Sequence, residues 1–412
     1  MVLNYVWVAF FLIAFVVALV KLIFLGDTEV FTSMMNGTFD SAKTGFTVAL
    51  GLTGALTMWM GILRVGQEAG AIRFLSRIVG PFFRKLFPEI PKGHEAHGHI
   101  ILNFSANMLG IGNAATPLGL QAMKSMQDLN TDKETASNSM IMFLALNTAG
   151  FCLIPVSILA LRASALSSDT SCVFVPIMIA SYFASLGGLI AVAIKQKIKL
   201  LDKVLLSWLL GITALVGFMI WSFTHMTPER RTIVSNVESS FILFSVIIIF
   251  IAGGVVKKLN VFSTFIDGAK EGFSTAVKII PYLVAMLLAI GVFRACGAMD
   301  YLVAGFDWCF HKMGVNTDFT PTLPVAFMKP LSGGGTQGLV ADLINKDHFG
   351  PDSFVGKLSS VMYASGDTTF YIVALYFGSV GIKKTRYAIG AGLVADLCGI
   401  VAAILISYAF WH

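Results

Sequence analysis

Charged side chains are scarce in this sequence: they make up 13% of its 412 residues, whereas apolar residues make up 56%. A water-soluble protein of this length needs a far more polar surface, so a single soluble core is excluded. The net charge of +6 is of the kind that basic cytoplasmic loops give to membrane proteins. We therefore expect a protein embedded in a lipid bilayer that binds no nucleic acid.

Cysteines and catalytic motifs are also rare. The five cysteines form no C-x-x-C pair, and cysteine in apolar runs usually acts as a small hydrophobe. The sequence has no H-E-x-x-H, no G-x-S-x-G and no Ser/His/Asp set, and the glycine-rich stretch 332–338 lacks the G-K-[ST] of a P-loop. His94, His97 and His99 crowd one loop but do not suggest a closed zinc site. We expect neither an enzyme nor a resident metal or other cofactor.

Long apolar runs are abundant instead, and about 20 such residues cross the hydrocarbon core of a bilayer. The first run has no basic segment before it and no small-residue cleavage site after it, so we expect a retained helix rather than a signal peptide. Uninterrupted membrane spans are predicted at 4–25, 46–64, 170–194, 203–223, 238–256, 275–294 and 385–410.

Other apolar segments carry interruptions or charge. Four of them contain internal Gly, Pro or Asn, namely 97–123, 134–161, 321–346 and 353–380. Two amphipathic stretches, 65–87 and 296–315, are expected to form helices along the membrane interface. The alternative for these two is an ordinary helix packed on its own protein.

The chain repeats itself. The motif DSAKTGF at 40–46 matches DGAKEGF at 267–273 at five of seven positions, and each copy precedes an apolar span that ends in GILR or GVFR. An amphipathic stretch, two interrupted segments and a final span then follow in the same order in both copies. The predicted division is repeat A at 1–200, a connecting transmembrane helix within 201–235, and repeat B at 236–412.

The distribution of positive charge tests how the segments cross the membrane. Three of the 29 Lys and Arg residues, Lys278, Lys329 and Lys357, fall within membrane segments. If 97–123 and 321–346 enter and return as re-entrant hairpins, 18 of the others lie on the side of the N-terminus and 8 on the opposite side; if both cross fully, the split is 14 to 12. Positive residues favour the cytoplasm. We therefore predict hairpins, a cytoplasmic N-terminus, an external C-terminus and two repeats of inverted topology in a bacterial inner membrane.

Polar residues cluster at the interruptions of both copies. Broken backbone at membrane depth is tolerated where it is buried in protein or lines a wet cavity, where it can bind a solute or ion; glycine packing faces with buried Asn are the alternative. Asp367 is the preferred site carboxylate and Lys329 its expected counter-charge, although a purely structural Lys–Asp pair is also compatible. The candidate solute- and ion-binding residues are Asn103, Asn107, Asn113, Thr116, Asn147, Thr148, Lys329, Ser332, Gly334, Thr336, Gln337, Asp367, Thr368 and Thr369.

One charged residue stands beside the first hairpin. Glu68 follows Arg64 in GQEAGA and is a candidate gating residue. A plain surface charge on an interfacial helix explains it equally well.

Two pairs of signatures carry a resemblance to a known family. The first half contains WMGILRVGQEAG at 59–70 and N-x-x-x-N-x-x-G-x-G-N-A-A-T-P-x-G at 103–119, and the second contains MKPLSGGG at 328–335 and GDTTFYIVALYFGS at 366–379. The chain resembles spore maturation proteins A and B joined in one polypeptide. That family carries a nucleoside-recognition, or gate, domain and is similar in layout to concentrative nucleoside transporters.

The resemblance implies that solute and coupling ion are held between hairpin tips and unwound helices in a moving transport domain. The expected fold is therefore an all-α polytopic membrane protein with two inverted-topology repeats, each with a re-entrant hairpin, an unwound transmembrane helix and an interfacial helix. The expected function is secondary active transport of a small polar metabolite coupled to Na⁺ or H⁺. A non-transporting membrane scaffold or sensor is the alternative, and the likeness is compatible with a homo-oligomer.

Overall fold

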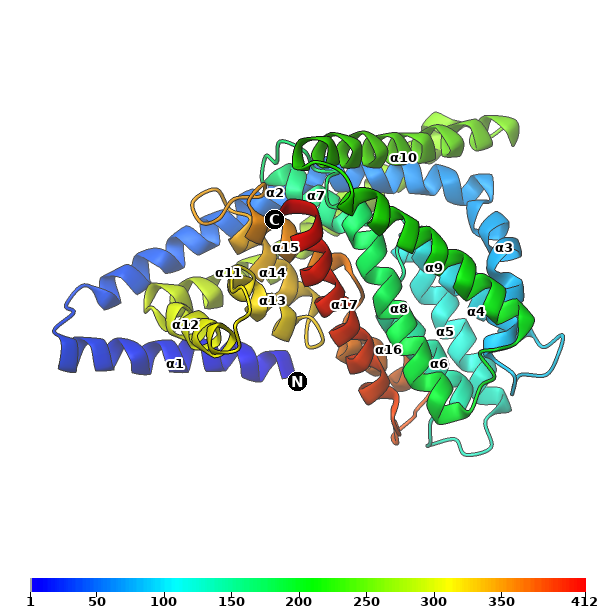
Figure 1. Cartoon of the computed structure of the whole chain (residues 1–412), viewed down its shortest axis with the longest axis horizontal. Coiled ribbons are helices and arrows are strands. Elements are labelled where there is room, and N and C mark those ends of the chain that lie inside the picture. Colours follow the sequence, from blue (N-terminus) through cyan, green and yellow to red (C-terminus); the bar gives the residue numbers. More distant parts are fainter. Residues whose placement is uncertain (1) are drawn as a thin grey trace.

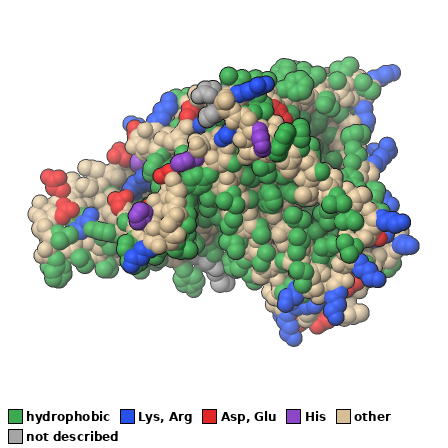
Figure 2. All heavy atoms as spheres, in the orientation of Figure 1, with side chains coloured by type: hydrophobic (Ala, Val, Ile, Leu, Met, Phe, Trp, Pro, Cys, Tyr) green, Lys and Arg blue, Asp and Glu red, His purple; other side chains and the backbone are tan. Residues whose placement is uncertain are grey.

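The computed structural model describes residues 2–412, and the side chains of all of these except residues 2, 3, 228, 229 and 232. The described chain is all-helical, with no β-strand among these residues (Figure 1). Hydrophobic side chains cover the broad middle of the face in Figure 2, and Lys and Arg gather at its lower end, where α8 and α16 end in Figure 1. This is the surface of a multi-pass membrane protein.

The seven uninterrupted spans predicted from hydropathy are confirmed. Among the described residues, seven helices are long and apolar enough to cross a bilayer, and only 11% of the apolar window of α1 and of α9 is buried in the protein. Those two helices therefore present most of their apolar surface to lipid. The seven are α1 (Val2–Leu25), α2 (Val30–Ala69), α8 (Phe174–Gln196), α9 (Lys203–Thr224), α10 (Pro228–Val256), α11 (Val261–Ala295) and α17 (Ala388–Trp411).

The four predicted interruptions are also confirmed, because each of the four segments consists of two helical parts. Glycine and proline break them: Gly110 and Gly150 have φ of +72° and +51°, a region that favours glycine, and Pro330 follows the short helix of the third segment. The paired helices are α4 (Glu95–Met108) and α5 (Gly112–Leu129), α6 (Asn138–Ala149) and α7 (Val156–Ser164), η1 (Thr320–Thr322) with α13 (Leu323–Met328) and α14 (Gly333–Leu343), and α15 (Phe354–Ala364) and α16 (Thr369–Ser379).

The two amphipathic stretches form separate helices, α3 (Ala71–Leu86) and α12 (Ala298–Lys312). Each follows a glycine with positive φ, Gly70 at +95° and Gly297 at +82°, where the chain turns away from the preceding long helix. In α3, Arg73 is exposed and Val79 is buried, as expected for a helix with one apolar face. A position along the membrane interface remains a prediction for both helices.

The repeated motifs lie within α2 and α11, which pack closely along each other. The glycine of each motif faces the partner backbone: a Cβ on Gly45 would lie 3.0 Å from the Cα of Val284, and one on Gly272 would lie 2.6 Å from the carbonyl oxygen of Leu56 and 2.8 Å from the Cα of Thr57. Small residues let membrane helices approach at such distances. The motif thus specifies the packing of the two longest helices against each other.

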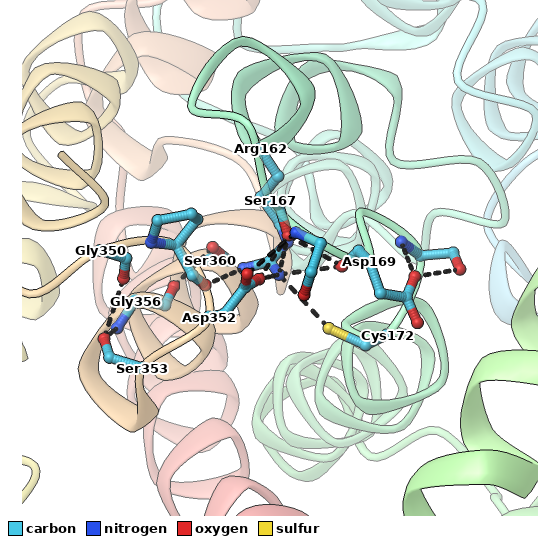
Figure 3. A network of polar contacts seen from close by, with 12 residues as sticks. Arg162, Ser167, Asp169, Cys172, Gly350, Asp352, Ser353, Gly356 and Ser360 are labelled. Atoms are coloured by element: carbon cyan, nitrogen blue, oxygen red, sulfur yellow. Dashed lines mark hydrogen bonds and ion pairs between the residues drawn. The ribbon is translucent and has the colours of Figure 1, made fainter. Parts of the chain in front are cut away.

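A buried arginine joins the two halves of the chain (Figure 3). Arg162, near the end of α7, is 0% exposed. Its guanidinium donates to the carbonyl oxygens of Pro351 at 2.6 Å and Asp169 at 3.0 Å and to Oγ of Ser167 at 2.8 Å, and it pairs with Asp352 at 3.3 Å. These bonds fix the end of α7 to the loop that precedes α15.

Candidate functional site

A polar cavity of about 260 Å³ lies where the broken segments of both halves meet. Residues from the breaks of α4–α5, α6–α7, α13–α14 and α15–α16 all contribute to its wall. Six of the candidate residues predicted from the sequence line it, drawn from positions some 260 residues apart, namely Asn107, Asn147, Lys329, Thr336, Asp367 and Thr368.

The two unwound helices cross at this cavity. The N–H of Asp367 donates to the carbonyl oxygen of Thr148 at 2.7 Å. A Cβ on Gly366 would lie 3.1 Å from that same oxygen, and one on Gly150 would lie 3.3 Å from the amide nitrogen of Asp367. The two glycines therefore permit the backbones to touch, and the contact satisfies peptide groups that the broken helices leave free.

The breaks of the four segments are bonded in pairs in the same way. In the first half, the N–H of Leu153 donates to the carbonyl oxygen of Met108 at 2.7 Å; in the second, the N–H of Phe370 donates to the carbonyl oxygen of Pro330 at 3.0 Å. In both cases a residue near the second break of the half donates to a residue at its first break. The two halves thus build the cavity from equivalent parts.

Lys329 is the buried cation of the cavity, with only 2% of its surface exposed. Its Nζ donates to Oγ of Ser365 at 2.6 Å. Asp367 is exposed at the cavity, and its Oδ1 accepts the N–H of Thr368 at 2.7 Å. Lys329 and Asp367 form no direct ion pair among the described side chains, so the expected counter-charges face one cavity without touching.

The amides of the first half form a connected chain. Nδ2 of Asn107 donates to Oδ1 of Asn147 at 2.7 Å, and Nδ2 of Asn147 donates to the carbonyl oxygen of Phe143 at 2.9 Å. Asn103 is fully buried beneath the cavity wall and donates to the carbonyl oxygen of Ala115 at 2.8 Å. Asn107 and Asn147 therefore face the cavity, whereas Asn103 holds α4 to α5.

Asn113 does not reach the cavity. It lies at the exposed start of α5, and its Nδ2 donates to Oε2 of Glu271 on α11 at 2.9 Å. Arg64 pairs with Glu68 at 3.1 Å and lies 3.9 Å from Glu271. Glu68, the predicted gating residue, is thus linked to the start of α5 through Arg64 and Glu271.

Three of the remaining candidates form hydrogen bonds at the starts of α14 and α16. Oγ of Ser332 accepts the N–H of Gly335 at 3.0 Å and so caps α14, and the hydroxyl of Thr336 donates to the carbonyl oxygen of Ser332 at 2.6 Å. Thr369 donates to Oδ2 of Asp396 at 2.5 Å. Thr116, Thr148, Ser332, Gly334, Gln337 and Thr369 are not among the residues that form the cavity wall.

Three further residues take part that the sequence did not single out. Ser365 holds Lys329, and its signal was its place in the interrupted stretch ASGDTT. Glu271 lies in the second copy of the repeated motif, and the equivalent residue of the first copy is the uncharged Thr44. Of the two positions at which the copies differ, this is the one where the charge differs. Asp396 is a lone carboxylate in the middle of an apolar helix, which by itself names no partner.

A second, apolar cavity of about 130 Å³ shares Asn107, Asn147 and Gly150 with the polar one. Its other walls are mainly aromatic and aliphatic and include Tyr182 and Trp208. The paired amides therefore stand between a polar space and an apolar one.

The three crowded histidines have structural contacts. His94 caps α4 by accepting the N–H of Ala96, Nε2 of His97 lies 3.3 Å from the carbonyl oxygen of Ile90, and Nδ1 of His99 lies 2.9 Å from Oγ of Ser125. Their ring nitrogens do not converge on one point among these contacts. Each histidine is therefore bonded to a residue of α4, of α5 or of the loop before α4.

Comparison with known proteins agrees with this architecture. The family model described as "Gate: Nucleoside recognition" matches residues 49–165 and 276–383, which hold the broken segments of both halves. Spore maturation protein B of Bacillus subtilis (strain 168) is 44% identical over 171 residues, covering 40% of this chain and 93% of that protein. Spore maturation protein A of the same organism is 35% identical over 187 residues, covering 45% of this chain and 92% of that protein.

No solved structure matches the chain. The gate model nevertheless covers more than half of the 412 residues, and both spore maturation relatives are matched over nearly their whole length. The chain therefore belongs to the nucleoside-recognition (gate) family, as a fused form of spore maturation proteins A and B.

Proposed function

We propose that this protein is a secondary active transporter of a small polar metabolite. The observation that carries the proposal is the polar cavity at the crossing of two unwound helices, with buried Lys329 and exposed Asp367 facing it from the second half and amides from the first. Ionisable groups at membrane depth are costly and typically mark solute or ion pathways. Binding between the hairpins and the broken helices is the arrangement that inverted-repeat transporters use.

Contacts between loops support re-entrant hairpins. In the hairpin topology, each of three ion pairs joins loops on one side of the membrane; if 97–123 and 321–346 crossed fully, each would join opposite sides. Side chains cannot bridge a hydrocarbon core about 30 Å thick. The pairs are Lys85–Asp202 at 2.8 Å, Glu134–Lys383 at 2.5 Å and Arg162–Asp352 at 3.3 Å.

The same topology gives two repeats of opposite orientation. Four crossings in 1–200, one in the connecting segment 201–235 and four in 236–412 turn the second copy upside down. We infer a cytoplasmic N-terminus and an external C-terminus in the inner membrane, in keeping with the positive charge of the loops. The first hairpin then opens from the cytoplasm and the second from outside.

We infer an elevator-type motion in which hairpins and unwound helices move as one body against the long helices. The link from Asn113 through Glu271 and Arg64 to Glu68 joins the first hairpin to α11 and α2. These ion pairs are about 40% exposed, so each is worth little alone and is easily exchanged. They suit a latch that must open in each cycle, with Glu68 acting through Arg64.

The cavity suits a zwitterion or a small organic anion. An ammonium, a carboxylate and two amides are complementary to an amino acid, a dipeptide, an organic anion or a nucleoside-like solute, and the adjoining apolar cavity would accept a hydrophobic arm. Either Na⁺ or H⁺ would supply the driving force. The protein would carry out no covalent chemistry.

Flux measurements test the proposal. Liposomes that contain the purified protein are loaded with a mixture of amino acids, dipeptides, organic acids and nucleosides. Mass spectrometry then follows the movement of these solutes across the membrane under Na⁺ or H⁺ gradients. We expect one class of solute to move with wild type and with Asp347→Asn, a control on the exposed loop after α14, but not with Asp367→Asn. No movement by wild type under any gradient would overturn transport.

A mutational scan separates transport from a scaffold or sensor role. If the protein only recruits partners, substitutions at Lys329 and Asp367 would be tolerated while the loop surfaces would not. We expect the reverse for a transporter. Tolerance of charge-removing substitutions at both positions would argue for the scaffold.

A further inference from the structure

A buried carboxylate beside the site has no assigned role. Asp396 lies in the middle of α17 and is 3% exposed. Its Oδ2 accepts the hydroxyl of Thr369 at 2.5 Å, whereas Oδ1 has no hydrogen-bond partner. A carboxylate that is charged, buried at membrane depth and unpaired at one oxygen is among the costliest groups a protein can hold.

The surrounding charges do not neutralise it. The charged groups that face Asp396 are Lys329 from the second hairpin and Asp367 from the break between α15 and α16. The ammonium of Lys329 is bound by Ser365, and no ion pair joins it to either carboxylate among the described side chains. One cation therefore stands against two carboxylates, and one positive charge is missing.

The described contacts offer a metal cation few ligands at Asp396. Hard cations need several oxygen ligands, and Thr369 is the one residue bonded to the Asp396 carboxylate among the described contacts. A proton needs no such set of ligands.

We propose that Asp396 is a proton-binding residue of this protein and holds a proton in the conformation described. Protonation makes Asp396 a neutral acid, and burying its unbonded oxygen then costs less free energy than burying the same oxygen of a carboxylate. It also leaves Lys329 and Asp367 as a balanced pair across the cavity. The proton would leave when the O–H bond of the acid breaks and a water molecule of the cavity accepts it.

A proton site at Asp396 also identifies the coupling ion of transport, and this inference rests on the proposed function. Asp396 is bonded to Thr369, the first residue of α16, and Thr369 directly follows the cavity residues Asp367 and Thr368. Loss of the proton would leave Lys329 facing two carboxylates, which favours a cationic group in the cavity. The driving ion would then be H⁺ rather than Na⁺.

The test reads the proton directly and needs no solute. Infrared difference spectra of the purified full-length protein in liposomes are compared at about pH 5, where exposed aspartates are ionised, for wild type, Asp396→Asn and Asp396→Glu, with Asp347→Asn as control. We expect a carbonyl band of a protonated acid in wild type and in the control. It should shift in ²H₂O, disappear in Asp396→Asn and change frequency in Asp396→Glu.

Each other result counts against the assignment. A wild type without the band, or a band retained unchanged in Asp396→Asn and Asp396→Glu, overturns it. Loss of the band on adding Na⁺ at constant pH would instead assign a cation site. If Asp396→Asn fails to fold, the shift of the band in ²H₂O and its frequency in Asp396→Glu test the assignment. An intact band without solute flux in liposomes would contradict the proposed transport function but not the proton site.

Discussion

At the scale of single residues, buried charge in this protein is held by backbone carbonyls and hydroxyls more than by direct ion pairs. Arg162 bonds to two carbonyl oxygens and one hydroxyl, and Lys329 to one hydroxyl. Neutral acceptors of this kind satisfy a buried cation without burying a second charge, which would add its own desolvation cost. Two carboxylates are the exceptions. Asp352 is partly exposed and pairs with Arg162. The buried Asp342 pairs with Arg294 and His348.

Removing Asp352 should destabilise the protein. Asp352→Ala leaves the fully buried Arg162 without its ion-pair partner, and we expect a loss of about 3 kcal/mol, at the low end for a broken buried pair because the carbonyl bonds remain. Thermal unfolding in detergent measures it. Asp267→Ala, which breaks an exposed pair with Lys270, is the control and should cost less than about 1 kcal/mol; equal losses would contradict this role.

At the scale of elements, glycine decides how closely helices approach. The motif glycines let α2 and α11 touch backbone to backbone, and Gly150 and Gly366 do the same for the unwound helices. The spacing of these positions was visible in the sequence as a repeat. The sequence did not show that the repeat encodes a helix crossing, because a crossing depends on a partner more than 200 residues away.

Filling one of these contacts should separate α2 from α11. In Gly272→Leu the new side chain would meet the backbone of Leu56 and Thr57, and we expect a loss of about 1–3 kcal/mol from overpacking. Gly54→Leu, on α2 with no atom within 4 Å of its Cβ position, is the matched control and should stay within about 0.5 kcal/mol. Unfolding in detergent compares them, and a harmless Gly272→Leu would refute the close crossing.

The contribution of the loop after α14 to the stability of the protein should depend on pH. The side chain of Asp342, which also pairs with Arg294, accepts a hydrogen bond from His348 and raises the pKa of that histidine above 6.5, although burial acts to lower it. A raised folded-state pKa stabilises the protein below the ordinary histidine pKa, and this contribution is lost as pH rises through the raised value.

Substitution of this histidine gives the measurement. The difference in unfolding free energy between wild type and His348→Gln should be larger at about pH 6, where this histidine is charged, than at about pH 9, where it is neutral. Unfolding in detergent across this range reports it. A difference that stays constant with pH would show that His348 contributes no charge.

At the scale of the whole molecule, the two topologies differ in where they place two exposed residues, one in the last turn of α5 and one in the loop after α14. Re-entrant hairpins put residue 128 inside and residue 347 outside, whereas two fully crossing segments put both outside. We expect Asp128→Cys and Asp347→Cys, each in a chain whose five native cysteines are replaced by serine or alanine, to react with a membrane-impermeant maleimide from opposite sides of sealed vesicles. Reaction of both from the same side would exclude the inverted arrangement.

The positions of the helices and of their breaks could be predicted from the sequence, because span length, apolar runs, Gly and Pro are local signals. Six residues that line one cavity could be predicted as well. The pairing of polar side chains could not: Lys329 bonds to Ser365 rather than Asp367, Asn113 reaches Glu271, and Arg162 joins the halves. Such pairings depend on how helices far apart in the chain pack together, and apolar lipid-facing helices carry little sequence information about which neighbour they meet.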